Sequence, residues 1–433
     1  MKQNPEHRKT DKKKRILPIM MTAVTAAALI FTVFQAAQLL RPVKAEETVP
    51  QVTEEMSSGE TAAAETAEGN ETEAAVILDE QELSDLIAWC GDIPAELKNY
   101  ESRFYYNQLT EYQQQIYRII LHSAFNQIEK TPEFPIPDGD ASAQIFRAMK
   151  AMWYDYGEIF WFRNQGTLYT AGKPGNGVGS LELQYAHERA QRVTMQDFID
   201  SVTQPVTDSL QGLSDYEKIL GVHDFLIDYL TYDNSSRGAS LYDTLSSGTG
   251  VCEGYTRAAQ YMLGKLGIPA VYISGQILKD GEFEDYHAWN LVEAEGDYYQ
   301  MDVTWDDAEL DDGSCYTWYD YLLVTDEEMM RNRTRDLESF PACDAQSLNY
   351  FRVEEAYAVV YDPEQIIREL RDSQNHDGVL QLRAMDEQVL AELKTRLIDE
   401  KEIYDYLRKA VGDTGPVTYW VDWDTLVFRL HWG

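Results

Sequence analysis

The sequence predicts an α+β protein whose core is a cysteine-bearing helix packed on an antiparallel sheet, with a further α+β domain on either side. Three observations lead to this prediction. Helical and strand-like patterns alternate from Leu78 onward, a glycine-rich turn leads into a helical pattern at Cys252, and the segment 286–305 has the pattern of a β-hairpin. With 433 residues, the chain is long enough for two or three domains.

The chain is strongly acidic, and its charge is unevenly distributed. The formal net charge is −37, yet residues 1–15 carry a net +5, so the remaining residues carry −42. Nucleic acids require a basic face for their phosphates, so this composition argues against nucleic acid as a partner. It argues against docking on an anionic lipid surface for the same reason.

The N-terminal residues predict export. A basic head, 1–15, precedes an uncharged run from Ile16 to Phe34 that is long enough to cross a bilayer. Because basic residues stay on the cytoplasmic side, the bulk of the chain is expected to lie outside the cell membrane. We interpret residues 16–40 as a transmembrane anchor. The alternative is a signal peptide cleaved after "VKA", before Glu46, which would give a secreted protein.

Composition divides the remainder into a stalk and three folded parts. Residues 46–77 hold nine Glu, no Lys or Arg and no aromatic residue. Such a segment cannot bury enough apolar area to offset the entropy of ordering, so we expect a disordered acidic stalk. We expect an N-terminal α+β domain at 78–205, the core at 206–325 and a C-terminal α+β accessory domain at 326–433.

Periodicity predicts the elements of the two flanking domains. In the first, an apolar helical stripe follows Thr110, a candidate N-cap, and 143–156 is a second helix, while 158–162 and 167–171 have the composition of short strands. In the second, the patterns predict a helix, a strand, one long helix and a strand pair, in the order 363–373, 379–385, 386–411 and 417–432.

The core begins with helices and ends with a hairpin. The sequence "SDYE" at 214–217 is a capping box that starts one helix, and a second helix runs from Cys252 to a glycine stop at Gly267. "AVYISG" follows as a buried strand. "YHAWNLVEAEGDYYQMDVTW" then predicts a hairpin that turns at Glu295–Gly296.

The register of that hairpin places a histidine beside an aspartate. If the turn is centred between Glu295 and Gly296, counting outward pairs Trp289 with Asp302. Because side chains alternate along a strand, His287 lies on the same face as Trp289 and is a diagonal neighbour of Asp302, within reach of its carboxylate.

These residues suit nucleophilic catalysis by a thiol. Cys252 stands at a helix N-terminus, where a thiol loses its proton most easily. His287 would act as general base and then general acid, and Asp302 would hold the imidazole tautomer. The backbone N–H of Cys252 would be one oxyanion donor, and Tyr242, ten residues upstream, is a candidate for the second.

The same blocks resemble a known family. "GTGVCEGYTRAAQYMLGKLGIPAVYISG" and "YHAWNLVEAEGDYYQMDVTWDD" closely resemble the transglutaminase-like superfamily, papain-like cysteine enzymes with Cys, His and Asp in that chain order. The resemblance covers about 205–325 and implies that Cys252, His287 and Asp302 match the catalytic positions. The flanking parts look like those of exported bacterial proteins that carry this domain. The resemblance implies no cofactor, and the calcium sites of animal transglutaminases have no recognisable counterpart.

Other polar and aromatic residues have structural interpretations. His223 lies on the apolar side of its helix and is expected to be a core histidine with satisfied hydrogen bonds. Glu253 is expected to favour the helix N-terminus electrostatically. Trp289 and Trp305 would either line the cleft or pack in the core.

No motif indicates a metal. The acidic run Asp306–Gly313 lacks the spacing of an EF-hand and is expected to be a solvated loop rather than a calcium site. No histidine or cysteine spacing is typical of zinc. In an exported chain Cys315 and Cys343 are candidates for a disulfide.

Three hypotheses about function follow. The first is a membrane-anchored, outward-facing thiol enzyme that forms a thioester from an amide of a protein or peptide, such as a surface protein or cell-wall peptide. With water as acceptor it would be a cysteine peptidase or amidase, and with an amine it would be a transglutaminase. The second is a non-catalytic binding or scaffolding module at the cell surface. In the third, the flanking domains carry the main role.

Overall fold

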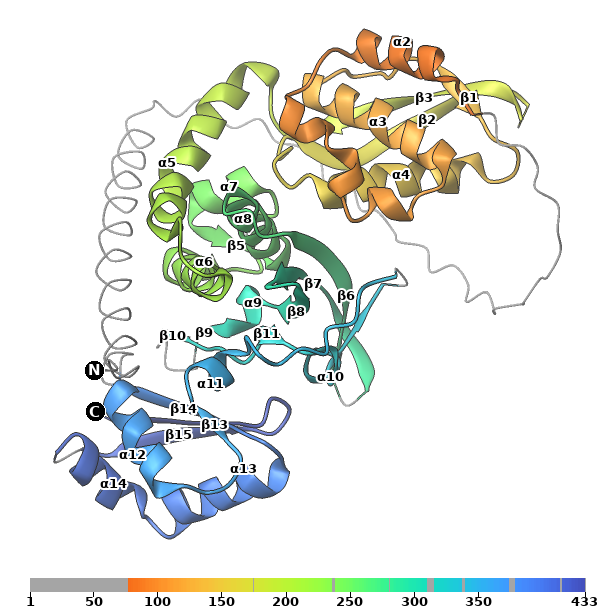
Figure 1. The fold of residues 1–433 in the computed structure, drawn as a ribbon. Coiled ribbons are helices and arrows are strands. Elements are labelled where there is room, and N and C mark those ends of the chain that lie inside the picture. The colour runs from red at the N-terminus through yellow and green to blue at the C-terminus, as the bar shows by residue number, and fades with distance from the viewer. Residues whose placement is uncertain are drawn as a thin grey trace, which may run out of the picture.

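The described part of the protein consists of three larger sheets with their helices and two small two-stranded sheets. The computed structural model describes residues 77–432 apart from 174, 236–237, 280, 310–314, 337–338, 374–377 and 413–414. The part that holds the five-stranded sheet lies between the other two (Figure 1). The expected basic head, membrane segment and all but the last residue of the stalk lie outside the described residues. Within the described ranges, no helix is long and apolar enough to cross a membrane.

The N-terminal part is a three-stranded antiparallel sheet, ordered β1-β3-β2, with helices against it. Thr110 caps α3 as expected, because its side chain accepts from the Gln113 N–H while the Gln113 side chain accepts from the Thr110 N–H. The elements are α2 Glu80–Cys90, α3 Glu111–Asn126, β1 Phe134–Ile136, α4 Ala141–Asp155, β2 Phe162–Lys173 and β3 Asn176–Tyr185.

The central part has a five-stranded antiparallel sheet, ordered β11-β8-β7-β6-β12, with a layer of helices on it. Helix α8 contacts both β6 and β7 and is covered by α6 and α7. The principal elements are α5 Arg192–Leu210, α6 Asp215–Tyr229, α7 Leu241–Ser247, α8 Cys252–Lys265, β6 Ala270–Lys279, β7 Glu282–Ala294, β8 Asp297–Met301, β11 Leu322–Val324 and β12 Arg333–Arg335. The shorter elements are β4 Thr231–Tyr232, β5 Thr249–Gly250, α9 Val303–Asp306, β9 Asp307–Glu309, β10 Cys315–Thr317 and α10 Asp326–Met329.

Local signals in the sequence fix how the helices of the central part start and stop. Ser214 caps α6 in a reciprocal box with Glu217, as its motif predicts. Gly267 has a φ of +77° just after α8, the left-handed conformation that ends a helix and favours glycine. Both helix ends expected here are therefore confirmed.

The β7–β8 hairpin has the expected register. Ala294 pairs with Asp297 across the turn. Glu295 has a φ of 53° and Gly296 a φ of 87°, so both turn residues are left-handed, as a two-residue hairpin turn requires. The pairing continues inward to Asn290 and Met301, which places the next positions, Trp289 and Asp302, opposite each other.

The C-terminal part is a four-stranded sheet, ordered β13-β14-β16-β15, with its longer helices on the side away from the central part and α11 on the near side (Figure 1). Strands β13 and β14 are parallel and the other pairs are antiparallel. The elements are α11 Tyr350–Val353, β13 Tyr357–Ala358, α12 Pro363–Asp372, β14 Val379–Ala384, α13 Glu387–Lys394, α14 Ile403–Ala410, β15 Val417–Asp422 and β16 Val427–Trp432.

Two expected elements are wrong in the flanking parts. The long helix expected at 386–411 is broken, because α13 passes into a π-helical turn at Thr395–Asp399 and Lys401 then has a φ of 66°, which a right-handed helix cannot contain. Of the strand expected at 158–162, only Phe162 belongs to β2. Ile159, Phe160 and Trp161, which precede it, are buried in the core although they lie in a turn, so their burial does not come from strand pairing.

Two elements lie across the domain limits drawn from the sequence. Helix α5 spans residue 205 without a break and packs on α6 and α7 of the central part. Strand β12, at 333–335, completes the central sheet by pairing with β6, although the sequence assigned it to the accessory domain. Its three residues, Arg-Thr-Arg, are all polar and show no alternation of apolar and polar residues that would predict a strand.

Gly254, in the first turn of α8, allows the loop before the helix to pack closely. A methyl group there would lie 2.5 Å from the Gly238 carbonyl oxygen and would collide with the Thr244 hydroxyl. We expect Gly254→Ala to lower the free energy of unfolding by about 1–3 kcal/mol, because the backbone must shift. Denaturant unfolding measures this.

Gly264 provides the matched control in the same helix. An added methyl group at Gly264 meets nothing within 4 Å. We expect Gly264→Ala to stabilise the protein by about 0.5–1 kcal/mol, because alanine is the better helix former. Equal effects at the two sites would contradict this account of the helix start.

Candidate active site

Cys252 begins α8 at a point where the preceding loop is tightly held. Val251 is the N-cap residue and gives no side-chain cap. Its N–H donates to the Gly238 carbonyl oxygen at 3.3 Å, and the Thr244 hydroxyl donates to the same oxygen at 2.8 Å. The Cys252 side chain is half-buried. The first N–H groups of a helix have no intrahelical acceptor, so those of Cys252 and Glu253 suit a negative charge beside the sulfur.

His287 and Asp302 meet across the hairpin as the predicted register requires. The Nε2 atom of His287 lies 2.7 Å from Oδ2 of Asp302. The side chain of Cys252 is the other polar neighbour of the imidazole and, like Asp302, raises its pKa. Both His287 and Asp302 are buried. The structure therefore pairs the imidazole with the carboxylate and places the Cys252 side chain close enough to act on the same ring.

The electrostatics of this group favour a charged imidazole. Burial alone would lower the pKa of His287, but the Asp302 carboxylate outweighs it, and the pKa is raised to about 9. Burial alone would raise the pKa of Asp302, but His287 and then Arg333 outweigh it, and the pKa lies below its usual value. At neutral pH the pair is thus an imidazolium beside a carboxylate.

Arg333 is a fourth member of the group that the sequence did not reveal. It lies on β12, is 1% exposed, and its Nη1 donates to Asp302 Oδ2, the oxygen that also faces His287. Its guanidinium lies 4.1 Å from the ring centroid of Tyr321 and 4.4 Å from that of Trp305. A buried carboxylate that is paired with two cations is held in place more firmly than one that is paired with a histidine alone.

Two tryptophans flank the histidine. The ring of Trp289 stacks on His287 with centroids 6.0 Å apart, and the ring of Trp305 meets it edge-on at the same distance. Trp289 is buried and donates to Gln300, so it packs in the core while it supports the histidine. Trp305 is half-buried and lies nearer the surface.

The structure does not bring Tyr242 to this group. Its ring, on α7, packs against Phe160, His187 and Phe198 at centroid distances of 5.5–6.0 Å. Tyr242 was expected to be an oxyanion donor because it lies close to Cys252 along the chain. In the structure, the face of α7 that carries Tyr242 is turned toward the N-terminal part and α5. Two other tyrosines interact with Cys252: burial is the main cause that raises the pKa of both Tyr232 and Tyr272, and Cys252 contributes to each shift.

His223 has both ring nitrogens hydrogen-bonded, as expected of a core histidine. Nδ1 lies 3.0 Å from Asp224 and Nε2 lies 3.1 Å from Asp306. Burial alone would lower its pKa, but the two carboxylates raise it to about 9. The expectation that the acidic run from Asp306 is a solvated loop is therefore wrong at its first residue, which is fully buried as the partner of His223. Residues 310–314 of that run lie outside the described residues.

Among the described residues, the cysteines form no disulfide and the acidic groups form no metal site. All four cysteines are described and none is in a disulfide, so the candidate bridge between Cys315 and Cys343 is absent. Cys343 is buried with its sulfur 3.5 Å from Gln300 Nε2, while Cys315 is exposed on β10. Among the residues that the structure describes, no group of three or more His, Cys, Asp and Glu side chains could hold a metal ion.

We expect Arg333→Met to raise the pKa of His287 above about 9, because the cation that opposes the imidazolium is removed. Catalytic turnover should fall by about 10-fold to 100-fold, because Asp302 loses one of its two anchors. Histidine-selective NMR titration measures the pKa.

Arg335→Met is the matched control. Arg335 lies two residues further along β12 and pairs with Asp326 at 3.0 Å. This substitution should leave the His287 titration where it is in the wild type. A lowered pKa of His287 in Arg333→Met would contradict the assigned electrostatics.

Comparisons with known proteins agree with this fold. Residues 200–303 match the family model of the transglutaminase-like superfamily, which confirms the resemblance and identifies the central part as a transglutaminase-like core. None of the curated proteins compared with the chain matches it.

Three solved structures are similar over part of the chain. They are a "TGase" (16% identity, 32% of this chain, 43% of that chain, TM-score 0.24), a candidate cysteine protease from Cytophaga hutchinsonii (18%, 32%, 62%, 0.19) and a candidate protease from Parabacteroides distasonis ATCC 8503 (14%, 31%, 35%, 0.19). The chain therefore spans less than two thirds of the length of each.

Proposed function

We propose that this chain, whose segment 200–303 belongs to the transglutaminase-like superfamily, is a thiol enzyme that acts on amide bonds of proteins or peptides. The observation that carries the proposal is the buried pair of His287 and Asp302, with Nε2 2.7 Å from Oδ2, and the Cys252 side chain that acts on the same imidazole. A thiol, a base and a group that orients the base are the three parts that nucleophilic catalysis by cysteine requires.

Each residue has one role in the proposed reaction. The Cys252 thiolate attacks the amide carbonyl carbon, and the oxyanion that forms accepts hydrogen bonds from N–H groups at the start of α8. The His287 imidazolium gives its proton to the leaving amine as the C–N bond breaks, which leaves a thioester on Cys252. The imidazole then takes a proton from the acceptor, which attacks the thioester and releases the thiolate. Asp302 holds the ring in place through both half-reactions.

The proposed mechanism needs the charged imidazole in its first half. Because the pKa of His287 is about 9, we expect activity to fall as the pH rises through that value. The decline should follow the titration of His287 in the same protein.

The acceptor is tested by competition between water and an amine. Incubation with glutamine-containing peptides, with and without a primary amine, followed by mass spectrometry, separates a gain of water from a gain of amine. Either product, absent from Cys252→Ala, supports the proposal. If neither forms across a broad set of peptides and wall fragments while the protein binds them unchanged in Cys252→Ala, the non-catalytic module is favoured.

We also propose that the enzyme works outside the cytoplasmic membrane, on surface proteins or wall peptides. The support is the basic head, the uncharged run at 16–40 and the acidic, aromatic-free stalk. Protease accessibility of the folded parts on intact cells tests this location, with degradation expected only if the bulk of the chain faces outward.

A further inference from the structure

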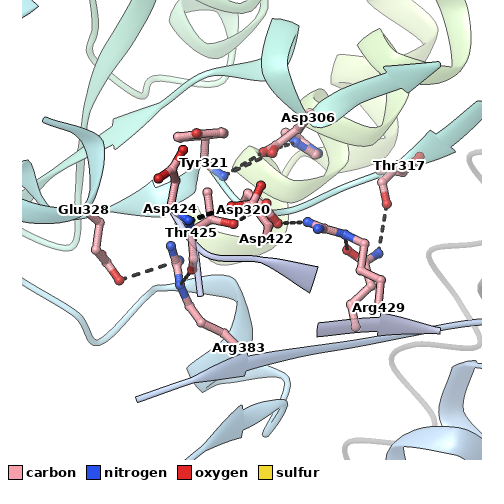
Figure 2. A network of polar contacts seen from close by, with 12 residues as sticks. Asp306, Thr317, Asp320, Tyr321, Glu328, Arg383, Asp422, Asp424, Thr425 and Arg429 are labelled. Atoms are coloured by element: carbon pink, nitrogen blue, oxygen red, sulfur yellow. Dashed lines mark hydrogen bonds and ion pairs between the residues drawn. The ribbon is translucent and has the colours of Figure 1, made fainter. Parts of the chain in front are cut away.

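The C-terminal sheet contacts the turn that carries Asp302 through buried charges. Figure 2 shows Arg429, from β16, pointing into the central part toward Asp320. Arg429 and Asp320 are each 1% exposed, and Thr425 donates to the other oxygen of the same carboxylate at 2.7 Å. A carboxylate buried to this extent is stable only with such partners.

The contact extends along the segment 317–321. The Arg429 guanidinium lies 4.0 Å from the ring centroid of Trp318, and its Nε donates to Gln381 at 3.3 Å. Gln381 in turn donates to the Thr317 carbonyl oxygen at 2.9 Å (Figure 2). Arg429 therefore contacts this segment at Asp320 and Trp318, and through its hydrogen bond to Gln381 it also supports the attachment at Thr317.

The segment 317–321 in turn holds both ends of α9. The Asp302 N–H donates to the Tyr321 carbonyl oxygen at 3.1 Å, and the Tyr321 N–H donates to the Asp306 carboxylate at 3.1 Å. The Trp318 N–H donates to the Asp306 carbonyl oxygen at 2.8 Å. Helix α9 has only four residues, and one helical turn is not stable by itself.

A second buried arginine of the same sheet approaches from the other side. Arg383, on β14, donates to the Thr425 carbonyl oxygen at 3.1 Å and lies 3.6 Å from Glu328 (Figure 2). Glu328 belongs to α10, whose next residue, Met329, contacts the Arg333 guanidinium. Through α10 the C-terminal sheet thus also supports Arg333, which shares the Asp302 oxygen with His287.

We propose that Arg429 is a positioning residue for Asp302, so that the C-terminal domain is part of the catalytic machinery. The inference rests on the proposed function. Without Arg429 the Asp320 carboxylate is left buried and unpaired, and the segment must move to hydrate it. Tyr321 then moves away from the Asp302 N–H, and the carboxylate loses its alignment with His287.

The test measures how fast iodoacetamide alkylates Cys252 at pH 6, relative to free cysteine. Because the reagent is neutral, its rate of reaction follows the fraction of Cys252 that is thiolate. That fraction depends on the charge of His287, whose polar neighbours are Asp302, Cys252 and Arg333. The main variant is Asp320→Asn with Arg429→Met, which removes the link without leaving a buried charge. Thr425→Val removes a single hydrogen bond and keeps the proposal testable if the double variant does not fold.

We expect Cys252 of the double variant to label about 10-fold more slowly than Cys252 of the wild type at pH 6, because a displaced Asp302 no longer holds the imidazolium beside the sulfur. The labelling rate of Cys252 in Thr425→Val should also fall, but by a smaller factor. The control is Glu402→Gln, which removes the negative charge that accepts hydrogen bonds from Tyr361 and Tyr406 in the C-terminal part, and it should label like the wild type.

The outcomes separate the two proposals. Rapid wild-type labelling with unchanged rates in both the double variant and Thr425→Val overturns the positioning role alone. Wild-type labelling no faster than that of free cysteine overturns the proposed function and the positioning role with it. Equal slowing in Glu402→Gln would show a general loss of stability and would also overturn the role of Arg429.

Discussion

Replacement of Cys252 by alanine is expected to abolish turnover, with kcat lower by about 10⁴-fold or more. Cys252 is the cysteine whose side chain acts on the His287 imidazole, so we expect no second thiol to replace it. The measurement is kcat on whichever amide substrate the peptide and amine assay identifies.

The fold of this variant should be unchanged. Cys252 is half-buried and gives no cap to α8, whose N-cap residue is Val251. We expect the free energy of unfolding to change by less than about 1 kcal/mol. Cys315→Ala is the matched control, because it removes an exposed thiol and should retain full activity. Turnover that survives in Cys252→Ala would refute the thiol mechanism outright.

Replacement of Asp302 by asparagine is expected to lower kcat by about 100-fold to 10,000-fold with little change in KM. Asparagine removes the charge that raises the pKa of His287 to about 9, so that pKa should fall toward or below 6.5. The imidazole is then neutral at pH 7 and cannot protonate the leaving amine. A pH profile of kcat/KM and histidine-selective NMR measure the two effects.

The Asp302→Asn variant should also be less stable, because Arg333 keeps a buried charge without its partner. We expect a loss of about 3 kcal/mol, which the double variant Asp302→Asn with Arg333→Met should largely recover. Activity should not recover with stability. If the double variant regained both, Asp302 would be a structural residue only.

Asp306→Asn controls for the loss of a buried carboxylate near the site. Asp306 lies four residues after Asp302 and pairs with His223 instead of His287. We expect this variant to lose stability while the titration of His287 stays in place. If the pKa of His287 shifted equally in Asp302→Asn and Asp306→Asn, the shift would come from a general loss of order in α9 and not from the charge of Asp302.

The sequence predicted the hairpin half of the site well because the signal there is local. The turn at Glu295–Gly296 fixes the register, and the register fixes which residues face His287. The position of Cys252 follows from the helix start in the same way. These relations need no knowledge of how distant segments pack.

The parts that the sequence did not predict depend on contacts between distant segments. Arg333 reaches Asp302 only because β12 pairs with β6 across the sheet, and a three-residue polar strand has no signature of its own. Tyr242 was misplaced because the face of a helix that meets the site depends on its neighbours. The link from Arg429 to Asp320 joins residues 109 positions apart.

The most direct test is mass-mapped alkylation of the wild-type protein with limiting iodoacetamide at pH 6.5. The protein has its own controls, since Cys90 and Cys343 are buried and Cys315 is exposed. The proposed triad predicts that Cys252 is modified first and faster than free cysteine. Modification of Cys315 ahead of Cys252, or labelling of Cys252 no faster than free cysteine, would contradict an activated thiol.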